Sequence, residues 1–333
     1  MEKKVEEKLS GASPAVPAGN GSAAAAVQTG KGKPGGKGGK KGQAMSTPWR
    51  MAMKRLKRNK LAIAGLIFLI FMILLCFIGP LFSPYSMNEV DMAAAKQPPS
   101  AEHWLGTDDN GRDVFTRLLY GGQISMTVGL AATALEILIG AILGCVAAYY
   151  GGAVDFVIMR IVDVILSLPT MPILIMLSAM MSDWKVDPSV RVYYLMVILA
   201  SLGWAGTCRF VRGQVLTVRE MDYMSAAESL GIRDYRKIFK HIMPNVIPLI
   251  IVMATLAIGD TIIMESTMSF LGVGVLPPMS SWGQMVSEGN NLMIFKLRPW
   301  LWMPAGFCIL LTVLSVNLVG DGLRDALDPK MKR

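Results

Sequence analysis

Residues 61–81 read LAIAGLIFLIFMILLCFIGPL, and this uncharged run decides the class of fold. A helix that spans a bilayer needs roughly 20 mostly apolar residues, so the run is long enough to cross a membrane. Backbone amides surrounded by lipid must be hydrogen-bonded within their own segment, which makes the run a helix. It is also too long for the apolar core of a signal peptide, so we expect it to stay in the protein as an uncleaved anchor.

Five further apolar runs follow along the chain. Of its 333 residues, 53% are hydrophobic and 17% are charged, whereas charged residues make up about a quarter of a soluble domain. The additional runs are residues 124–148, 157–181, 192–208, 246–271 and 300–319. The sequence therefore predicts an all-α polytopic membrane protein with six transmembrane helices.

The distribution of charge predicts the orientation of these helices. Residues 1–60 contain 14 Lys/Arg and 3 Asp/Glu, whereas the rest of the chain contains 19 and 21. Because positive charge is retained on the cytoplasmic side, the N-terminus is expected there. Segment 82–123, with 3 Lys/Arg and 6 Asp/Glu, is predicted outside, and segment 209–243, with 7 and 4, inside. Six spans return the C-terminus to the cytoplasm. The net charge of +9 therefore reflects topology, and we expect no nucleic-acid partner.

Composition divides the chain into four parts. Residues 1–45 are rich in Gly, Lys and Ala and cannot bury a core, which predicts a disordered cytoplasmic tail. Residues 46–123 comprise a basic flank, the first transmembrane helix and an extracytoplasmic segment. Residues 124–320 form the core domain, and residues 321–333 form a cytoplasmic C-terminal tail.

Residues 220–244, EMDYMSAAESLGIRDYRKIFKHIMP, form a polar stretch between two apolar runs. Asp222 is expected to cap a short helix over residues 223–230. Gly231 stands where a helix commonly ends in the left-handed conformation. Asp234 is expected to cap a second helix. The stretch therefore predicts two short helices outside the membrane, on the cytoplasmic side.

The second of these helices is predicted to carry one apolar face, made of Tyr235, Ile238, Phe239 and Ile242. Pro244 is then expected to open the next span, where a missing N–H costs little. Small residues gather near the turn, namely Ser225, Ala226, Ala227 and Ser229. Such residues let another surface approach closely. Two interpretations remain open, docking of a cytosolic partner and a helix that rests on lipid headgroups.

Motifs for catalysis and metal binding are absent from the sequence. The four cysteines fall one each in apolar runs and read as small hydrophobic residues. His103 and His241, the only histidines, are predicted on opposite sides of the membrane, which excludes a histidine-based metal site. No phosphate-binding loop, serine-hydrolase motif or zinc-protease motif occurs. We therefore expect neither enzyme activity nor a cofactor in this chain.

Charged residues within membrane spans are costly and normally face protein or water. Candidates for the lining of a translocation path are Glu136, Asp260 and Glu265. The alternative for each is a structural hydrogen bond or ion pair between helices. Near the predicted cytoplasmic end of the spans, interhelical ion pairs are expected among Arg160, Asp163, Arg209 and Arg212.

The two long segments predicted outside the membrane, residues 82–123 and 272–299, are candidate contacts for a partner. The charged residues of the first are Asp108, Asp109, Arg112 and Asp113. They could meet a binding protein or cap the helix that leads into the second span, and the sequence does not decide between these roles.

The spacing of Ala226-Ala227, Gly231 and Pro244 resembles the EAA loop of ABC importer permeases, E-A-A-x-x-x-G-x(9)-I-x-L-P. The chain departs from that pattern at Ser225, His241 and Met243, where Glu, Ile and Leu are usual. Its HIMPN sequence resembles the HILPN variant of peptide permeases. The resemblance implies that coupling to an ATPase involves Ser225, Ala226, Ala227, Glu228, Ser229, Gly231 and Pro244.

Longer stretches extend this resemblance over about residues 46–333. They are HWLGTDDNGRDVFTRLLYGGQISM at 103–126, RIVDVILSLP at 160–169, RFVRGQVL at 209–216, SFLGVGVLPPMSSWGQM at 269–285 and NLVGDGLRDALDP at 317–329. Together they are similar to the "C" type permease of dipeptide and oligopeptide importers. That family implies the type I ABC importer fold and a bacterial cell membrane.

The same resemblance implies a set of partners. These are a homologous "B" type permease, two ABC ATPase subunits that bind ATP and Mg, an extracytoplasmic substrate-binding protein, a peptide substrate and membrane lipid. A nickel or metal-chelate permease of the same family stays the alternative. A channel or an integral membrane enzyme is a more remote one, for which neither a pore loop nor a site is visible.

Overall fold

The computed structural model describes residues 53–327, and its regular elements in that range are helices. One isolated β-bridge joins Thr107 and Asp113. The predicted tail 1–45 lies outside the described residues, as does the end of the predicted C-terminal tail from residue 328.

Five helices are long and apolar enough to cross a membrane. They are α2 (Lys60–Ile78), α3 (Val114–Tyr150), α6 (Pro188–Arg219), α9 (Met243–Phe270) and α12 (Met303–Leu327). The predicted all-α membrane fold is thereby confirmed for the described residues.

The predicted span 157–181 is not one straight helix. It is divided into α4 (Gly152–Ser167) and α5 (Thr170–Asp183), which meet at an angle of 83°. Pro169 explains the break, because a proline ring pushes the preceding residue out of the helical region. Leu168 is accordingly extended, with φ −80° and ψ 137°. The chain has six spans only if this bent pair is one of them.

Two other spans are longer than their apolar runs indicate. Helix α3 begins at Val114, because the carboxylate of Asp113 accepts the backbone N–H of Thr116 at 2.7 Å and caps the helix. Helix α6 begins at Pro188 and is capped in the same way by Asp187. Hydropathy therefore locates the lipid-facing part of each helix, and the polar caps locate its ends.

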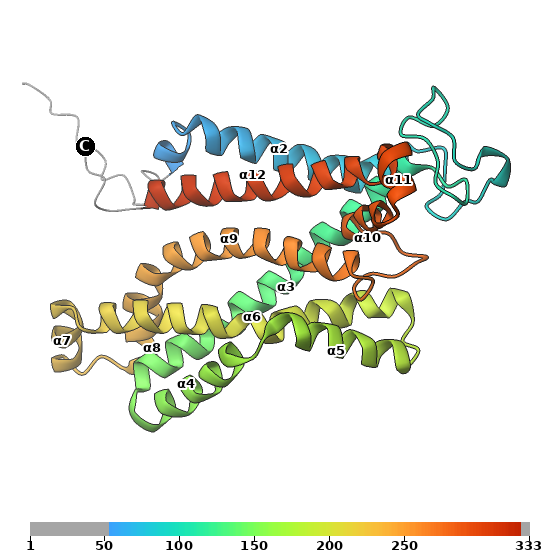
Figure 1. The fold of residues 1–333 in the computed structure, drawn as a ribbon. Coiled ribbons are helices and arrows are strands. Elements are labelled where there is room, and N and C mark those ends of the chain that lie inside the picture. The colour runs from blue at the N-terminus through green and yellow to red at the C-terminus, as the bar shows by residue number, and fades with distance from the viewer. Residues whose placement is uncertain (1–52, 328–333) are drawn as a thin grey trace, which may run out of the picture. The chain divides into compact units, whose positions relative to one another are not determined.

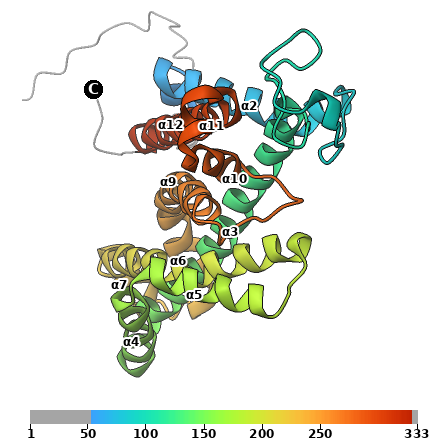
Figure 2. The ribbon, with the colours of Figure 1, turned by 45° about the vertical axis from the view of Figure 1, so that its right-hand side comes forward.

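Helices α3 and α6 make the most extensive helix–helix contact, and α3 crosses both α6 and α9 (Figures 1 and 2). Gly140 and Gly144 lie one turn apart on α3 at this contact. A methyl group at Gly140 would lie 2.6 Å from Cβ of Thr207, and one at Gly144 would lie 2.5 Å from the Cys208 carbonyl oxygen. Small residues four apart let the two backbones approach closely, as in other membrane helix pairs.

A second group of helices contains α2, α12 and α9. Helix α12 packs on both α2 and α9, and α2 runs alongside it in Figures 1 and 2. The fully buried Trp282 anchors the segment between α9 and α12, and its indole donates to the Leu118 carbonyl at 3.1 Å. Helix η1 (Gly79–Leu81) continues α2, and η2 (Met92–Ala94) lies before α3. The segment between α9 and α12 contains α10 (Trp282–Ser287), η4 (Glu288–Asn290), α11 (Leu292–Leu297) and η5 (Pro299–Leu301).

Candidate functional site

The polar stretch 220–244 forms one separate helix, α7 (Asp222–Ser229), followed by the start of a long one. Helix α8 (Asp234–Arg236) and the π-helix η3 (Lys237–Ile242) run directly into α9. The prediction of a second independent helix is therefore wrong. Pro244 follows the π-turn within this continuous helix and is exposed.

Neither predicted aspartate cap is formed. The N-cap positions are Met221 and Arg233, and no side chain caps either helix. Each aspartate instead occupies the first helical turn, where its charge favours the positive end of the helix dipole. The carboxylate of Asp234 is engaged elsewhere, since it accepts the Tyr149 hydroxyl at 2.6 Å.

The predicted left-handed glycine is confirmed. Gly231 has φ +66°, and its N–H donates to the Glu228 carbonyl at 2.9 Å. The N–H of Ile232 donates to the Ala227 carbonyl at 3.1 Å. These two bonds form a Schellman motif, which satisfies the last carbonyls of α7 and turns the chain back toward α8.

The predicted apolar face of the second helix is divided between core and surface. Ile242 is fully buried and Ile238 is half-buried, whereas Phe239 is 68% exposed and Tyr235 is also exposed. The π-turn of η3 is the reason, because its hydrogen bonds run from i to i+5 and shift the register of the face. Tyr235 and Phe239 thus stay available to a partner or to lipid, whereas Ile242 belongs to the core.

Helix α7 has an inner and an outer face. Met224 and Ala227 are buried, Ala227 with only 5% exposure. Met224 packs with Ile242 among residues of α3 and α6, including Cys145 and Val215. The outer face is exposed and consists of Ser225, Ala226, Glu228, Ser229 and the following Leu230. The small residues of the stretch thus point outward, with the exception of Ala227.

A polar cluster adds a second attachment of α7 to the spans. The Lys237 ammonium lies 3.0 Å from Asp234 and 3.7 Å from Glu228, so it joins α8 to α7. The Tyr149 hydroxyl joins the end of α3 to the same aspartate. The sequence did not indicate this cluster, because Tyr149 and Asp234 are 85 residues apart. Together with Met224, it fixes α7 to α3, α6 and α9.

Two of the charged residues within the spans meet at one hollow. Glu136 on α3 and Asp260 on α9 line a hollow of about 290 Å³, together with residues of α4, α5 and α6. The Glu136 carboxylate accepts the Thr207 hydroxyl at 3.0 Å. Gly203 leaves room for it, since a methyl group there would lie 2.6 Å from Oε2 of Glu136.

Glu265 lies outside the lining of this hollow and is fully buried. Its carboxylate accepts the hydroxyl of Ser125 at 2.9 Å and that of Ser269 at 2.7 Å. Ser125 in turn accepts the backbone N–H of Trp282 at 3.2 Å. The surroundings of Glu265 correspond to structural hydrogen bonds between α3, α9 and the start of α10.

The candidate ion-pairing residues connect α4 with α6. Arg209 pairs with Asp163, and Arg212 forms two bonds to Asp155, at 2.5 and 2.6 Å. Arg160 instead lies over the Phe156 ring, 5.2 Å from its centroid. The sequence interpretation omitted Asp155, although it lies two helical turns before Asp163 on the same helix.

The four charged residues before α3 are mostly engaged within the chain. Asp113 caps α3 and pairs with His103 at 3.0 Å, and the buried Asp108 pairs with both Arg112 and Arg117. The capping alternative thus applies to Asp113, whereas Asp108 and Arg112 form ion pairs within the chain. Asp109 is more exposed and pairs with Arg298. Burial raises the pKa of the Glu288 carboxyl in the same region, and Arg117 opposes this shift.

Comparison with known proteins identifies the family. Residues 137–333 match the family described as "Binding-protein-dependent transport system inner membrane component", and residues 47–99 match the N-terminal transmembrane domain of oligopeptide transport permease C. The chain is 43% identical to the dipeptide transport system permease protein DppC of Bacillus subtilis over 282 residues. The aligned residues cover 85% of this chain and 86% of the relative.

Two further similar proteins are also peptide transport permeases. The oligopeptide transport system permease protein OppC of B. subtilis is 40% identical over 286 residues, 86% of this chain and 90% of the relative. OppC of Haemophilus influenzae is 37% identical over 284 residues, 85% of this chain and 88% of the relative. The chain therefore belongs to the family of inner membrane components of binding-protein-dependent transport systems.

Proposed function

We propose that this chain is the C-type permease subunit of an ATP-driven importer of oligopeptides or dipeptides in a bacterial cell membrane. The names of its relatives support the substrate class and favour peptides over nickel. The observation that carries the mechanism is α7. It presents an exposed face of small residues while its other face is fixed to three membrane helices.

ATP hydrolysis belongs, in this proposal, to two partner subunits that bind ATP and Mg. An ATPase docks on the outer face of α7, around Ser225, Ala226 and Ser229. Movement of the ATPase then displaces α7, and the displacement passes through Met224 and Ile242 to α3 and α6. It passes to α9 directly, because η3 continues into that helix. Alternating access then arises from rocking of these helices around a fixed path.

The hollow that contains Glu136 and Asp260 is our proposal for this subunit's part of the path. Carboxylates in a membrane span are costly unless they face water or a ligand, and these two lie on helices that α7 would move. They carry the charge that attracts a peptide's N-terminal ammonium. The other half of the path comes from the B-type permease.

The proposed orientation follows from charge. The distribution of positive residues supports a cytoplasmic position for both termini and α7, and an outside position for the segments around α10–α11 and residues 82–113. An extracytoplasmic substrate-binding protein delivers the peptide to these outer segments. The exposed Trp104 and Asp109 are available for that contact.

Uptake in whole cells tests the proposal. A strain that lacks only this chain should lose uptake of a labelled dipeptide or tripeptide and keep uptake of free amino acids and of nickel. Plasmid-borne wild-type chain should restore peptide uptake. Normal peptide uptake together with lost nickel uptake would overturn the proposed substrate class and leave the metal-chelate permease in its place.

A further inference from the structure

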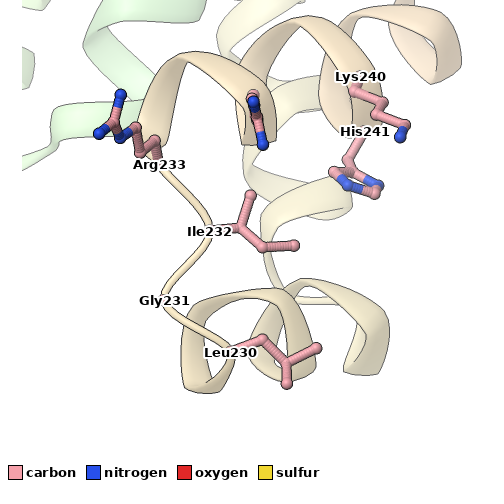
Figure 3. A pocket seen from close by; sticks show the side chains of 7 residues that line it. Leu230, Gly231, Ile232, Arg233, Lys240 and His241 are labelled. Atoms are coloured by element: carbon pink, nitrogen blue, oxygen red, sulfur yellow. The ribbon is translucent and has the colours of Figure 1, made fainter.

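A hollow of about 530 Å³ separates the end of α7 from the start of the long helix (Figure 3). In Figure 3 the connection through Gly231 and Ile232 rises from α7 below to the upper helix, which carries Lys240 and His241. The lining residues are Leu230, Gly231, Ile232, Arg233, Arg236, Lys240 and His241. The lining therefore contains three cations and no carboxylate.

These three cations lack an acidic partner among residues 53–327. The neighbouring carboxylates, Glu228 and Asp234, are both paired with Lys237, which lies outside the lining. All three line the same hollow and are exposed, so their positive potentials add there, and a negatively charged group in the hollow would be attracted. The hollow thus has the electrostatics of a receptor for a negatively charged group.

The position of the hollow along the helix argues against lipid headgroups as the main occupant. The apolar part of the helix starts near Val246. At 1.5 Å per residue, Lys240 lies roughly 9 Å and Arg233 roughly 20 Å before it. Headgroups occupy only about 5–7 Å on each side of the hydrocarbon core. On a helix that runs along the membrane normal, most of the hollow therefore lies beyond the lipid phosphates, and in the proposed orientation it faces the cytosol.

The chain's own ends have the wrong charge for this hollow. Residues 1–60 contain 14 Lys/Arg against 3 Asp/Glu, and the last six residues, DPKMKR, are also basic. A basic segment would be repelled by Arg233, Arg236 and Lys240. The occupant must come from another molecule.

We infer that the hollow receives an acidic side chain, or a short acidic segment, of the ATPase that docks on α7. This inference rests on the proposed function and adds the chemistry of the partner surface. The outer face of α7 supplies the close fit, and the hollow supplies the charge that sets orientation and speed of docking. The exposed Leu230 and half-buried Ile232 form an apolar rim beside the charged contact.

A triple neutral variant tests the inference in the assembled permease pair, held in lipid nanodiscs. Arg233→Gln, Arg236→Gln and Lys240→Gln together should weaken binding of the purified ATPase subunits by about tenfold at low salt and flatten its salt dependence. The matched control is Arg324→Gln, which removes an exposed cation at the end of α12. Wild-type affinity and salt dependence in the triple variant would overturn the inference.

A carbodiimide probe identifies the occupant directly, because it links a carboxylate to a lysine amine that touches it. Wild-type complex should yield a crosslink between permease and ATPase that maps to Lys240 and is lost in Lys240→Gln. If the triple variant weakens binding only in nanodiscs that contain anionic lipid, and no such crosslink forms, the hollow holds headgroups and the inference is wrong.

A further variant separates this inference from the proposed function. Ala226→Arg blocks the outer face of α7 without changing the hollow. If Ala226→Arg abolishes ATPase binding and the triple variant leaves it unchanged, only the inference fails. If ATPase binding is unchanged in Ala226→Arg, docking on α7 is itself disproved.

Discussion

Ala226 and Ala227 are neighbours in the sequence but differ in their exposure on α7. Ala226 is exposed, whereas Ala227 packs against the chain's own membrane helices with 5% exposure. Both belong to the EAA-like motif, so in the proposed function Ala226 serves contact with the ATPase and Ala227 serves attachment to the spans. The sequence alone could not distinguish them, because the inward direction of α7 depends on where α3 and α6 lie.

This difference predicts two phenotypes. Ala226→Arg should keep the wild-type melting temperature of the purified chain and lose retention of ATPase subunits. Ala227→Arg should lower the melting temperature as well, because a buried, unpaired guanidinium costs several kcal/mol. Thermal unfolding in detergent and co-purification of the ATPase measure the two effects. Equal melting temperatures for both variants would show that Ala227 is not buried in the protein.

The two carboxylates of the membrane hollow predict a charge effect on transport. Asp260→Asn, and Asp260→Asn with Glu136→Gln, should reduce peptide uptake while ATPase subunits are still retained. The reason is loss of attraction for the peptide's ammonium, so uptake of an N-acetylated peptide should change much less. If free and acetylated peptides are affected equally, the carboxylates do not contact the N-terminus.

Glu265 provides the matching structural control. It is surrounded by serine hydroxyls and fully buried, so Glu265→Gln should destabilise the chain by about 1–3 kcal/mol through imperfect hydrogen bonding. Thermal unfolding should detect this loss, with uptake per folded molecule preserved. A stable Glu265→Gln variant with impaired uptake would instead place Glu265 in the path.

At the scale of elements, the α3–α6 contact depends on Gly140 and Gly144, which a hydropathy pattern does not reveal. A Cβ added at Gly144 would meet the backbone of α6, whereas a Cβ added at Gly213 on α6 would have no atom within 4 Å. The G-x-x-x-G spacing of Gly140 and Gly144 was available in the sequence. It predicts a close helix contact in general, but not the identity of the partner helix.

Substitution by alanine should therefore have opposite effects at these positions. Gly213→Ala should keep or raise the melting temperature, because alanine is better than glycine in a helix by up to about 1 kcal/mol. Gly144→Ala should lower it, since overpacking of a tight contact typically costs about 1–3 kcal/mol. Similar changes in melting temperature for both variants in detergent would contradict the close α3–α6 contact.

The sequence predicted helices more reliably than their ends and bends. The apolar runs correctly indicated α2, α9 and α12, since lipid requires helices there. Pro169 is visible in the sequence and indicates the break between α4 and α5. The prediction of one span followed the length of the apolar run 157–181 instead. The π-turn of η3 had a weaker signal, the prolines at 244 and 248, and no local pattern specifies its register. The sequence predicted Asp222 and Asp234 as N-caps, whereas each is the first residue of its helix and the N-cap is the residue before it.

At the scale of the whole chain, the protein is a multi-pass membrane permease in which α7 is connected to both sides of the charged hollow. Glu136 lies on α3, which packs against Met224 of α7 and bonds Asp234 of α8 through Tyr149, and Asp260 lies on α9. These connections join residues far apart in sequence, which explains why sequence patterns identified the carboxylates but not the attachment.

The proposed orientation predicts which sites are accessible from outside the cell. In a chain without its four native cysteines, Ser100→Cys should react with an impermeant maleimide on intact cells. Ser229→Cys should react only after the membrane is permeabilised. Both side chains are exposed, so a difference between them reports topology. Labelling of Ser229→Cys on intact cells would reverse the orientation.

The most direct test of coupling is protection of α7 by the ATPase. Ala226→Cys, in the same cysteine-free chain, should react rapidly with a hydrophilic maleimide in the permease pair alone. Addition of the ATPase subunits should slow this reaction by about tenfold or more, while Ser100→Cys reacts at an unchanged rate. Equal reaction rates of Ala226→Cys with and without bound ATPase would contradict the assignment of α7 as the coupling helix.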